Sequence, residues 1–539
     1  MSDVIVTDVL IVGSGVAGAL VAHELALSGA RVTILEAGQS VVRYDAVQKF
    51  WNSAIKVPES PYPRKAEAMF PVSNEPADWY RQSGPVNFKS TYLKVVGGTT
   101  WHWLGTCLRL LPSDFKLKSL YSRGVDWPIT YDELEPFYGK AEHAMGVSGD
   151  STEDLGSPRS APFPMPPISP TYLDKKLTNA LDGTKYKVRS TPQARNSVFR
   201  DARSACCGSA SCVPICPVQA KYDATVHILK AVAAGAKLLE KSNAVKLNIE
   251  SDGKVSEVQF RRWDRSEGVV RAKIVVLACN AVEIPRLLLA SRSERTPNGV
   301  ANRSDQVGRN LMDHPAQLSW ALAAEPVYPY RGPISTSGIE NLRDGAFRRD
   351  RGAYRIEIGN DGWSWPKAAP MTTAQDFIDK GLRGKALDQA IADHTSRQFR
   401  LVSLIEQDPE QENRITLDGT DVDFYGVPLP RITYRISEYV QNGLAVARQD
   451  HEEIMKRWGA TEVTHADEFF GAGHIMGTTR MGTDPKTSVV DQNLQCHDHR
   501  NMFILGAGVF PTTGTANPTL TIAALSLRAA QQIRRVLVA

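Results

Sequence analysis

Four of the seven cysteines of the chain lie within eleven residues, and their spacing could hold an inorganic cluster. The segment runs Cys206-Cys207-Gly-Ser-Ala-Ser-Cys212-Val-Pro-Ile-Cys216-Pro217. Thiolates are the ligands that iron–sulfur clusters require, and a Cys-x3-Cys-Pro ending is typical of bacterial ferredoxin motifs. Neighbouring residues of an extended chain point to opposite sides, so only one of the first two cysteines can join Cys212 and Cys216 as a ligand.

Three other interpretations of these cysteines are open. A structural zinc site also uses thiolates, but its ligands usually come as two well-separated Cys-x2-4-Cys pairs. A disulfide or a set of free thiols is the other choice, although an odd number of cysteines in a large chain is untypical of a secreted disulfide framework. An iron–sulfur cluster with three cysteine ligands is our preferred hypothesis, and a four-iron cluster with a fourth ligand elsewhere is an alternative.

A glycine-rich turn near the N-terminus stands where a dinucleotide-binding turn should stand. A Val/Ile-rich strand at 4–12 leads into Gly13-Ser-Gly15-Val-Ala-Gly18, and an Ala/Leu-rich helical segment follows. A second strand at 31–35 comes next. This strand–turn–helix–strand order is the context in which the fingerprint is specific.

Each residue of the fingerprint has a physical task. Gly13 allows the tight turn, Gly15 lets the backbone approach a pyrophosphate, and Gly18 lets helix and strand pack closely. The free N–H groups at the helix N-terminus attract the phosphates. Glu36, at the end of the second strand, is placed to accept hydrogen bonds from the adenosine ribose.

Four more segments extend the pattern to the C-terminus. They are KVVGGTTWHW at 94–103, GHIMGTTRMG at 473–482, NMFILGAGVFP at 501–511 and GTANPTLTIAA at 514–524.

With these motifs, and with LACNAVEIPRLLLAS at 277–291 and GRNLMDHP at 308–315, the chain resembles the glucose–methanol–choline (GMC) oxidoreductases over its whole length. The cysteine segment makes it most similar to the flavoprotein subunits of bacterial glucose, fructose, gluconate and 2-ketogluconate dehydrogenases. The resemblance implies FAD as cofactor. It also implies an α/β Rossmann-type FAD-binding domain with a second α+β substrate domain, built from an antiparallel sheet and helices.

The resemblance further implies an active-site pair at His474 and Asn517. Oxidation of an alcohol needs a base for the hydroxyl proton while hydride leaves for flavin N5, and a neutral imidazole suits that role near pH 7. The asparagine amide can orient the hydroxyl and stabilise the developing oxyanion. Structural roles, with His474 as an ordinary histidine and Asn517 as a turn former before Pro518, are the alternatives.

Other cofactor contacts follow from the same resemblance. The helix that begins near Thr519 should direct its N-terminus at the flavin. A histidine after the hydroxyl pair is bonded covalently to flavin in the related pyranose oxidases, and His102 stands at the matching step, so a histidyl–FAD bond is our hypothesis, with simple stacking as the alternative. The remaining expected contacts are Gly97, Gly98, Thr99, Thr100, Ala507 and Pro518.

For the cysteines, the resemblance implies a 3Fe-4S cluster held by Cys206, Cys212 and Cys216, with Cys207 spare. A cluster passes one electron at a time, which suits a flavin that must feed a one-electron acceptor such as haem rather than oxygen. The resemblance also implies two partner subunits, a small export subunit and a multihaem cytochrome c that anchors the complex. We therefore expect a periplasmic enzyme at the inner membrane, with a cytoplasmic one as the alternative.

The layout is expected to be discontinuous. The FAD-binding domain should comprise 1–110, 195–320 and 460–539, and the substrate domain 111–194 and 321–459. Strands are expected at 355–358, 399–405 and 431–434, and a helix over 374–397.

Composition excludes some partners. A net charge of +4 over 539 residues gives no reason to expect nucleic acid. No apolar run is long enough to span a membrane, and the first residues carry no signal-peptide pattern.

The substrate cannot be chosen from sequence among sugars and sugar acids, although Arg480 could pair a carboxylate. The rival functions are a GMC-type alcohol or glycoside 3-dehydrogenase or oxidase, and a non-catalytic binding protein with a flavoprotein fold.

Overall fold

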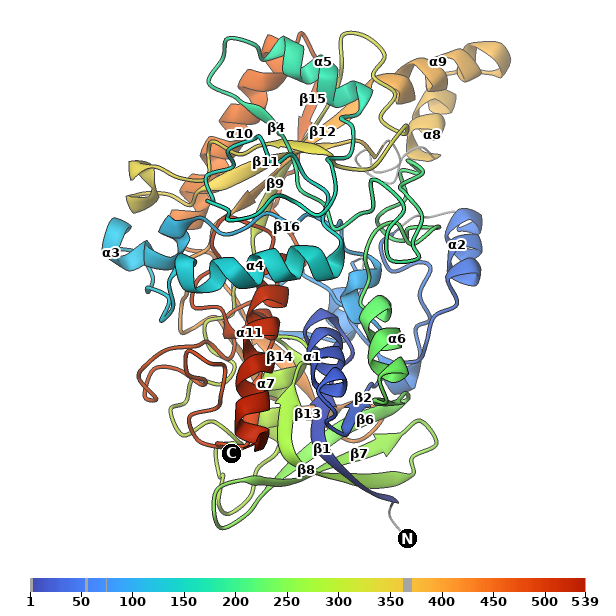
Figure 1. The fold of residues 1–539 in the computed structure, drawn as a ribbon. Helices are drawn as coiled ribbons and strands as arrows, with labels where there is room; N and C mark the ends of the chain where they lie inside the picture. The colour runs from blue at the N-terminus through green and yellow to red at the C-terminus, as the bar shows by residue number, and fades with distance from the viewer. Residues whose placement is uncertain (1–2, 54–56, 74, 362–370, 539) are drawn as a thin grey trace.

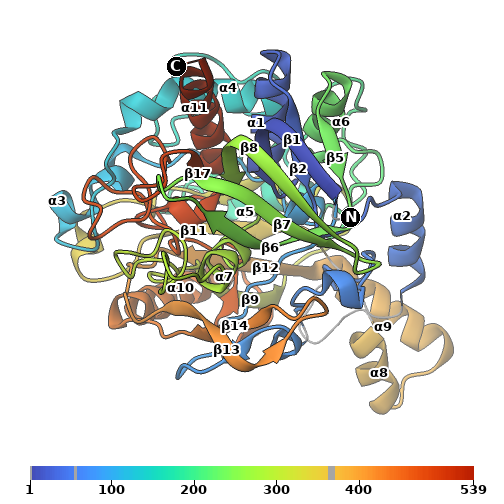
Figure 2. The same ribbon diagram turned by 90° about the horizontal axis from the view of Figure 1, so that it is seen from below.

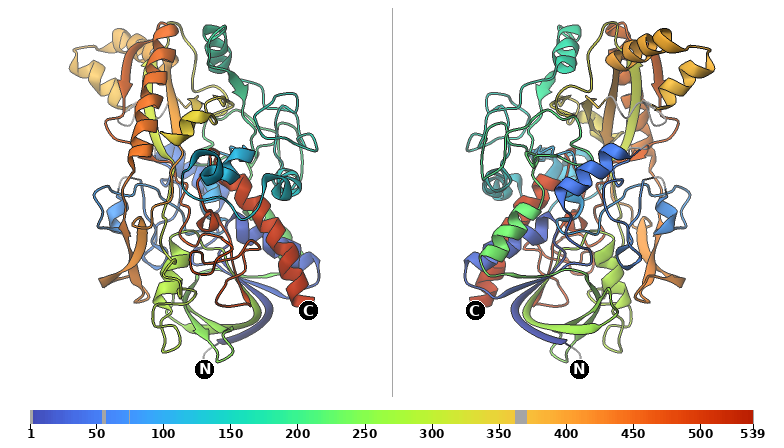
Figure 3. Two further views of the ribbon diagram at one scale, coloured as in Figure 1. Left: turned by 90° about the vertical axis from the view of Figure 1, so that its left-hand side faces the viewer. Right: turned by 90° about the vertical axis from the view of Figure 1, so that its right-hand side faces the viewer.

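The computed structural model describes residues 3–53, 57–73, 75–361 and 371–538. Two seven-stranded sheets organise the chain, one at each end of the molecule, and both termini lie at the end that holds the first sheet (Figures 1 and 3).

The first sheet has the order β5-β2-β1-β8-β7-β6, with β17 paired to β8. Its pairings are parallel around β1, β2, β5, β8 and β17, whereas β6, β7 and β8 are antiparallel to one another. The bounds are β1 Asp3–Val12, β2 Val32–Leu35, β5 Lys237–Leu239, β6 Ser242–Ile249, β7 Val255–Arg262, β8 Glu267–Leu277 and β17 Met502–Ile504.

Three helices cover one face of this sheet, as the view from below shows (Figure 2). They are α1 Val16–Leu27, α6 Thr225–Ala233 and α11 Thr519–Val538. α1 is apolar on nearly all sides because it lies between the sheet, α6 and α11. The inner half of β1, Val9 to Val12, is buried on both faces, as a central parallel strand should be. The expected strand–turn–helix–strand unit is therefore confirmed.

The second sheet has the order β15-β9-β12-β11-β10-β4, with β16 paired to β9, and all of its pairings are antiparallel. α10 Glu438–Arg457 packs on one face. The bounds are β4 Val188–Ser190, β9 Pro315–Leu322, β10 Ser337–Ile339, β11 Tyr354–Gly359, β12 Gln398–Ile405, β15 Thr461–His465 and β16 Phe470–Gly471. The expected α/β domain and a second domain with an antiparallel sheet are both present.

The smaller elements connect the two sheets. A three-stranded sheet, in the order β13-β14-β3, contains the strand expected at 431–434. Its bounds are β3 Arg81–Gln82, β13 Arg414–Val422 and β14 Pro428–Thr433. The other helices are α2 Arg43–Asn52, α3 Leu117–Tyr121, α4 Tyr131–Met145, α5 Tyr172–Ala180, α7 Glu283–Ala290, α8 Met371–Asp379 and α9 Gly384–Arg397.

The single helix expected over 374–397 is wrong, because the segment forms two helices, α8 and α9. Gly381, between them, and Gly384, the first residue of α9, have φ of +89° and +55°, which a continuing right-handed helix cannot contain. The pair projects from the second sheet (Figure 1).

Short 3-10 turns carry several of the residues that matter below. They are η1 Ala66–Ala68, η2 Pro76–Asp78, η3 Gly98–Trp101, η4 Pro112–Lys116, η5 Ala346–Arg349 and η6 Ala507–Val509. Among the described residues, no helix is both long and apolar enough to cross a membrane.

Candidate active site

A cavity of about 1340 Å³ is lined by residues of both sheets and of the turns that join them. It brings together most of the residues that the sequence singled out, namely Gly13, Gly15, Glu36, Gly98, Thr99, Thr100, His102, His474, Ala507, Asn517, Pro518 and Thr519. Residues as far apart in the sequence as Gly13 and Thr519 thus share one cavity. Gly18, Gly97 and the three candidate cluster cysteines do not line it.

The fingerprint turn has the geometry that a bound dinucleotide needs. Gly13 has a φ of +102°, and a Cβ on Gly18 would lie 2.0 Å from the Gly13 carbonyl oxygen, so both positions require glycine. A Cβ on Gly15 would meet no described atom within 4 Å, because this residue faces the open cavity. The turn therefore offers bare backbone at the N-terminus of α1, which fits a pyrophosphate.

Glu36 lies at the end of β2 and is bonded back to the turn. One carboxylate oxygen accepts hydrogen bonds from the Ser14 backbone N–H at 3.1 Å and the Ser14 hydroxyl at 2.6 Å. The other oxygen accepts from the Gly38 N–H at 2.8 Å. Burial raises the pKa of this carboxyl. Glu36 therefore has two roles. Its hydrogen bonds fix the turn, and its carboxylate lines the cavity, where it could bind a ribose.

Gly97 acts from behind the cavity. Its N–H donates to the Ser14 hydroxyl at 3.1 Å, and its φ of +92° starts the 3-10 turn η3. The GG-T-T loop is in this way tied to the fingerprint turn, although the two segments are more than 80 residues apart.

His474 and Asn517 lie side by side, as their expected joint role requires. The Asn517 amide nitrogen is 3.4 Å from His474 Nε2. The Asn517 Oδ1 atom is buried and has no hydrogen-bond partner among the described residues. The Asn517 amide and the His474 imidazole therefore face the same part of the cavity, where a hydroxyl could donate its proton to His474 Nε2 and accept a hydrogen bond from Asn517 Nδ2.

A second histidine, which sequence reasoning did not select, completes this group. His314 Nδ1 lies 2.9 Å from His474 Nδ1, and His314 Nε2 lies 3.0 Å from the carbonyl oxygen of Gly514. Burial lowers the pKa of His314 to about 4, so this ring is neutral at pH 7. Its motif, Asp313-His314-Pro315, was visible in the sequence, but nothing there showed that the ring meets His474.

The hydrogen bonds assign the tautomers of both rings. A carbonyl oxygen only accepts, so His314 carries its proton on Nε2 and presents a lone pair at Nδ1. His474 must then donate from Nδ1, which leaves a lone pair on its Nε2. Burial, then His314 and Arg355, hold the pKa of His474 well below its usual value. The nitrogen beside Asn517 is thus a neutral proton acceptor.

Asp313 fixes the backbone of both histidines. Its Oδ1 atom accepts from the His314 N–H at 2.7 Å and from the His474 N–H at 3.0 Å, and the Ser90 hydroxyl donates to its other oxygen. Burial raises the pKa of this carboxyl to about 6. The start of β9 and the segment before His474 are therefore clamped together.

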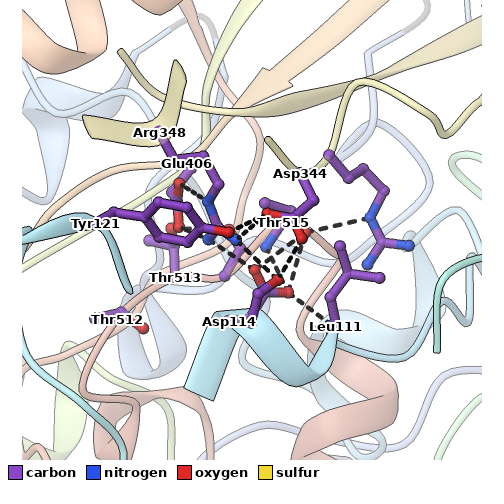
Figure 4. Close-up of polar contacts among 12 residues, drawn as sticks. Leu111, Asp114, Tyr121, Asp344, Arg348, Glu406, Thr512, Thr513 and Thr515 are labelled. Atoms are coloured by element: carbon purple, nitrogen blue, oxygen red, sulfur yellow. Dashed lines mark hydrogen bonds and ion pairs between the residues drawn. The ribbon is translucent and has the colours of Figure 1, made fainter. Parts of the chain in front are cut away.

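The loop that carries Asn517 rests on a buried charge cluster (Figure 4). Arg348 donates to Asp114 Oδ1 at 2.8 Å and to Glu406 Oε2 at 3.1 Å, and all three side chains are fully buried. The Thr515 hydroxyl donates to Asp114 Oδ2 at 3.0 Å. The carbonyl oxygen of Gly514, the neighbour of Thr515, accepts the hydrogen bond from His314 Nε2, so the cluster positions both His314 and Asn517.

His102 is buried against the cavity at the end of η3. Its Nδ1 atom has no hydrogen-bond partner among the described residues, and burial lowers the pKa of the ring. An uncharged imidazole with one open nitrogen facing the cavity fits either covalent attachment or contact with a flavin.

The cysteine loop lies directly behind this segment. The buried Lys221 ammonium donates to the carbonyl oxygens of Trp101 at 2.8 Å and Trp103 at 2.6 Å, and its backbone N–H donates to Cys216 Sγ at 3.5 Å. Lys221 therefore connects the two residues that flank His102 to the cysteine loop.

The cysteines differ in exposure in a way that separates the candidates. Cys212 and Cys216 are buried, Cys206 is half-buried and Cys207 is exposed. Burial raises the pKa of the Cys206 thiol, and the charges of Cys212 and Cys216 act on it as well, which places the three thiols near one another. Among the described residues, however, no three Cys, His, Asp or Glu side chains are arranged to hold a metal ion.

A buried cation beside the thiols has two nitrogen atoms without a hydrogen-bond partner among the described residues. Arg195 is fully buried, its Nη2 donates to the Leu104 carbonyl at 3.0 Å, and its charge lowers the pKa of Cys206. Its Nε and Nη1 have no hydrogen-bond partner among the described residues. An anionic group held by the thiols would satisfy this guanidinium, so the surroundings fit an iron–sulfur cluster.

Arg480 does not support the idea of a carboxylate clamp. Its Nε donates to the Thr487 carbonyl oxygen at 2.9 Å, and Arg480 is not among the described residues that line the cavity.

Comparisons with known proteins agree with this geometry. Residues 173–316 and 409–526 match GMC oxidoreductase families, and residues 8–82 match the FAD dependent oxidoreductase family. The chain is 38% identical to the fructose dehydrogenase large subunit of Gluconobacter japonicus, over 99% of this chain and 98% of that protein. It is 26% identical to the gluconate 2-dehydrogenase flavoprotein of Pantoea cypripedii, over 98% and 91% of the two chains.

The fold is shared with a solved structure, pyridoxine 4-oxidase from Mesorbium loti. The TM-score is 0.65 at 18% sequence identity, and the match covers 98% of this chain and 99% of the other. Family, fold and cavity agree. The chain is therefore a member of the GMC oxidoreductase family, an FAD-dependent dehydrogenase that acts on CH–OH donors.

Proposed function

We propose that the chain is the catalytic flavoprotein subunit of a sugar dehydrogenase that delivers its electrons through a 3Fe-4S cluster to a cytochrome c subunit. Similarity to the fructose dehydrogenase large subunit over the full length supports the sugar substrate and the existence of partner subunits. The observation that carries the electron route is the contact between cysteine loop and cavity wall through Lys221.

The chemistry at the cavity follows from the hydrogen bonds. The fingerprint turn, Glu36, the GG-T-T loop and the segment from Ala507 to Thr519 would hold FAD, which accepts a hydride from the substrate carbon when bound. His474 Nε2 takes the substrate hydroxyl proton, while His314 holds the ring in the required tautomer. Asn517 orients the hydroxyl and stabilises the charge that develops on its oxygen.

The cluster would be held by Cys206, Cys212 and Cys216. Cys207 is exposed whereas Cys206 is half-buried, which supports Cys206 as the third ligand. Arg195 is a buried cation next to the thiols and would offset the negative charge of the cluster. Burial lowers the pKa of Lys221 to about 7, and negative charge at Cys216 and Cys212 acts to raise it, so a cluster held there would favour the ammonium form. A cluster places several irons and sulfides between its ligands, so its thiolates stand further apart than those around one metal ion.

Two further parts of the proposal rest on the family. His102, with its open nitrogen, would form a covalent bond to FAD. A small export subunit and a multihaem cytochrome c would place the enzyme in the periplasm, beside the inner membrane.

The test of the electron route is iron and sulfide analysis combined with low-temperature EPR of the purified complex. We expect about three irons per chain and an EPR signal of the oxidised cluster that disappears when sugar is added. Cys212→Ser should lose iron and signal, whereas Cys207→Ser, a change at the exposed neighbour, should keep both. If Cys207→Ser and Cys212→Ser retain equal iron, or if the wild type contains none, the cluster is excluded.

A further inference from the structure

One face of the second sheet forms the cavity wall beyond the histidine pair. β9, β12 and β11 are adjacent, and their register aligns Leu318 with Val402 and Trp320 with Arg400. On the next strand Val402 faces Glu357. Together with Asp361 at the end of β11, these side chains line the cavity, and we call them the sheet-face subsite: Leu318, Trp320, Val402, Arg400, Glu357 and Asp361.

This subsite extends well past the reacting groups. Ala316 begins the cavity-facing row of β9, two residues after His314, whose ring contacts His474. Trp320 follows four residues later, and a strand rises about 3.3 Å per residue, so it lies about 13 Å further along the wall. A wall of that length is longer than one sugar ring, so a single ring that reacts at His474 would not extend to Trp320.

The far part of the wall has an apolar side and a polar side. Leu318, Trp320 and Val402 belong to one small buried cluster that stands apart from the main core. Along the edge, Arg400 Nη2 lies 2.8 Å from Asp361 Oδ2, and Arg400 Nε is buried without a partner among the described residues. The Trp320 ring beside the Arg400–Asp361 ion pair suits a sugar. The C–H faces of a sugar are apolar and can pack on an aromatic ring, and its hydroxyls need fixed donors and acceptors.

The charges of the wall select against acidic ligands. Arg355 is shared between two carboxylates, since its Nη2 lies 2.8 Å from Glu340 Oε1 and its Nη1 contacts Glu357. One cation therefore serves two anions, while the Arg400–Asp361 pair is balanced. Among the described residues of this wall the net charge is negative, which disfavours a substrate carboxylate. The Glu357 carboxylate, although paired with Arg355, has further lone pairs that can accept hydrogen bonds from the hydroxyls of a neutral ligand.

We infer that the sheet-face subsite binds a second, neutral sugar ring, so that the preferred substrate is a glycoside of at least two rings rather than a free monosaccharide or a sugar acid. This inference rests on the proposed function, because it assumes that a sugar ring reacts at His474.

The experiment compares kcat/KM for a neutral disaccharide, its constituent monosaccharides and gluconate. The wild type should favour the disaccharide at least tenfold, the scale at which one pocket contact discriminates. Trp320→Ala should remove that preference and leave kcat/KM for the monosaccharide within about twofold of the wild type.

Two further variants complete the experiment. Arg400→Gln tests the polar side of the subsite without a large change in side-chain volume. Trp51→Ala, at an exposed position of α2, is the matched control.

A binding measurement keeps the result independent of turnover. The disaccharide should raise the melting temperature of enzyme with reduced flavin, and this shift should be lost in Trp320→Ala and Arg400→Gln but not in Trp51→Ala. Equal kcat/KM for mono- and disaccharide, or an equal loss for both in Trp320→Ala, would overturn the subsite. If disaccharide binds but no sugar reduces the flavin, the proposed function fails while the subsite stands.

Discussion

Among single residues, the proposed proton transfer depends on two histidines that are joined by a hydrogen bond between their Nδ1 atoms. His314 sets the tautomer of His474, so His314→Ala should lower kcat by about 10²-fold. KM should change little, because the variant loses the fixed tautomer of the base and keeps the groups that bind the substrate. Anaerobic flavin reduction in a stopped-flow instrument measures this. His143→Ala, at an exposed position of α4, is the control.

The same variant has a signature that a merely structural residue would lack. His314 gains a positive charge only near its own pKa of about 4, and that charge, added to the effect of burial, opposes protonation of His474. Its removal should therefore move the acid limb of the pH–rate profile to higher pH. An unchanged profile in His314→Ala would show that His314 only supports the fold.

The pH dependence of the wild type is a separate prediction. The pKa of His474 lies well below its ordinary value, so the base remains neutral as the pH falls through about 6.5, the usual pKa of histidine. The rate of flavin reduction by a given substrate should therefore stay constant near pH 6.5 and decline only at lower pH. Asp313, with a pKa of about 6, also titrates in this range, and Asp313→Asn removes it. A half-maximal rate near pH 6.5 that persists in Asp313→Asn would contradict the assignment.

At the scale of elements, the buried cluster around Arg348 positions the active-site loop (Figure 4). Arg348→Met leaves Asp114 and Glu406 buried and uncompensated, which should cost about 3–5 kcal/mol in the free energy of unfolding. Urea unfolding followed by tryptophan fluorescence measures the loss. Arg303→Met, at an ion pair whose arginine is 83% exposed, should leave stability unchanged. Equal unfolding midpoints for the two variants would contradict this role for the cluster.

Elements that are continuous in sequence could be predicted, and those that depend on distant partners could not. β1, α1 and β2 follow from one uninterrupted segment in which the strand, turn and helix patterns are local. The strand at 431–434 was also predicted, but its membership in the small sheet with β3 depends on residues about 350 positions away. The same limit applies to His314, whose contact with His474 spans 160 residues.

Motifs predicted the candidate site better than they predicted its support. Twelve of the residues expected to contact substrate or cofactor line one cavity, because close backbone approach demands glycines and hydroxyls that a sequence displays. Among the groups that hold them in place, Lys221 and Arg348 have ordinary surroundings in the sequence, and Asp313 lies in a motif that does not show its contacts. Their function comes from burial and from partners that only the fold brings together.

At the scale of the whole molecule, the two sheets have separate tasks. The first sheet and its helices present the nucleotide-binding turn, and the second sheet supplies the wall against which a substrate would bind (Figure 3). The cavity residues come from both, which explains why the active-site pair must be clamped to β9 by Asp313. The division of the chain at residues 110, 194, 320 and 459 stays a prediction.

The most direct test of the central claim is anaerobic mixing of the purified flavoprotein with a neutral sugar while the flavin absorbance is followed. We expect the flavin absorbance of the wild type to bleach within one turnover. His474→Ala should slow this flavin reduction by about 10²–10⁴-fold, the usual contribution of a general base. We also expect His143→Ala to behave as the wild type does. Bleaching at an unchanged rate in His474→Ala, or none with any sugar in the wild type, would contradict the central claim.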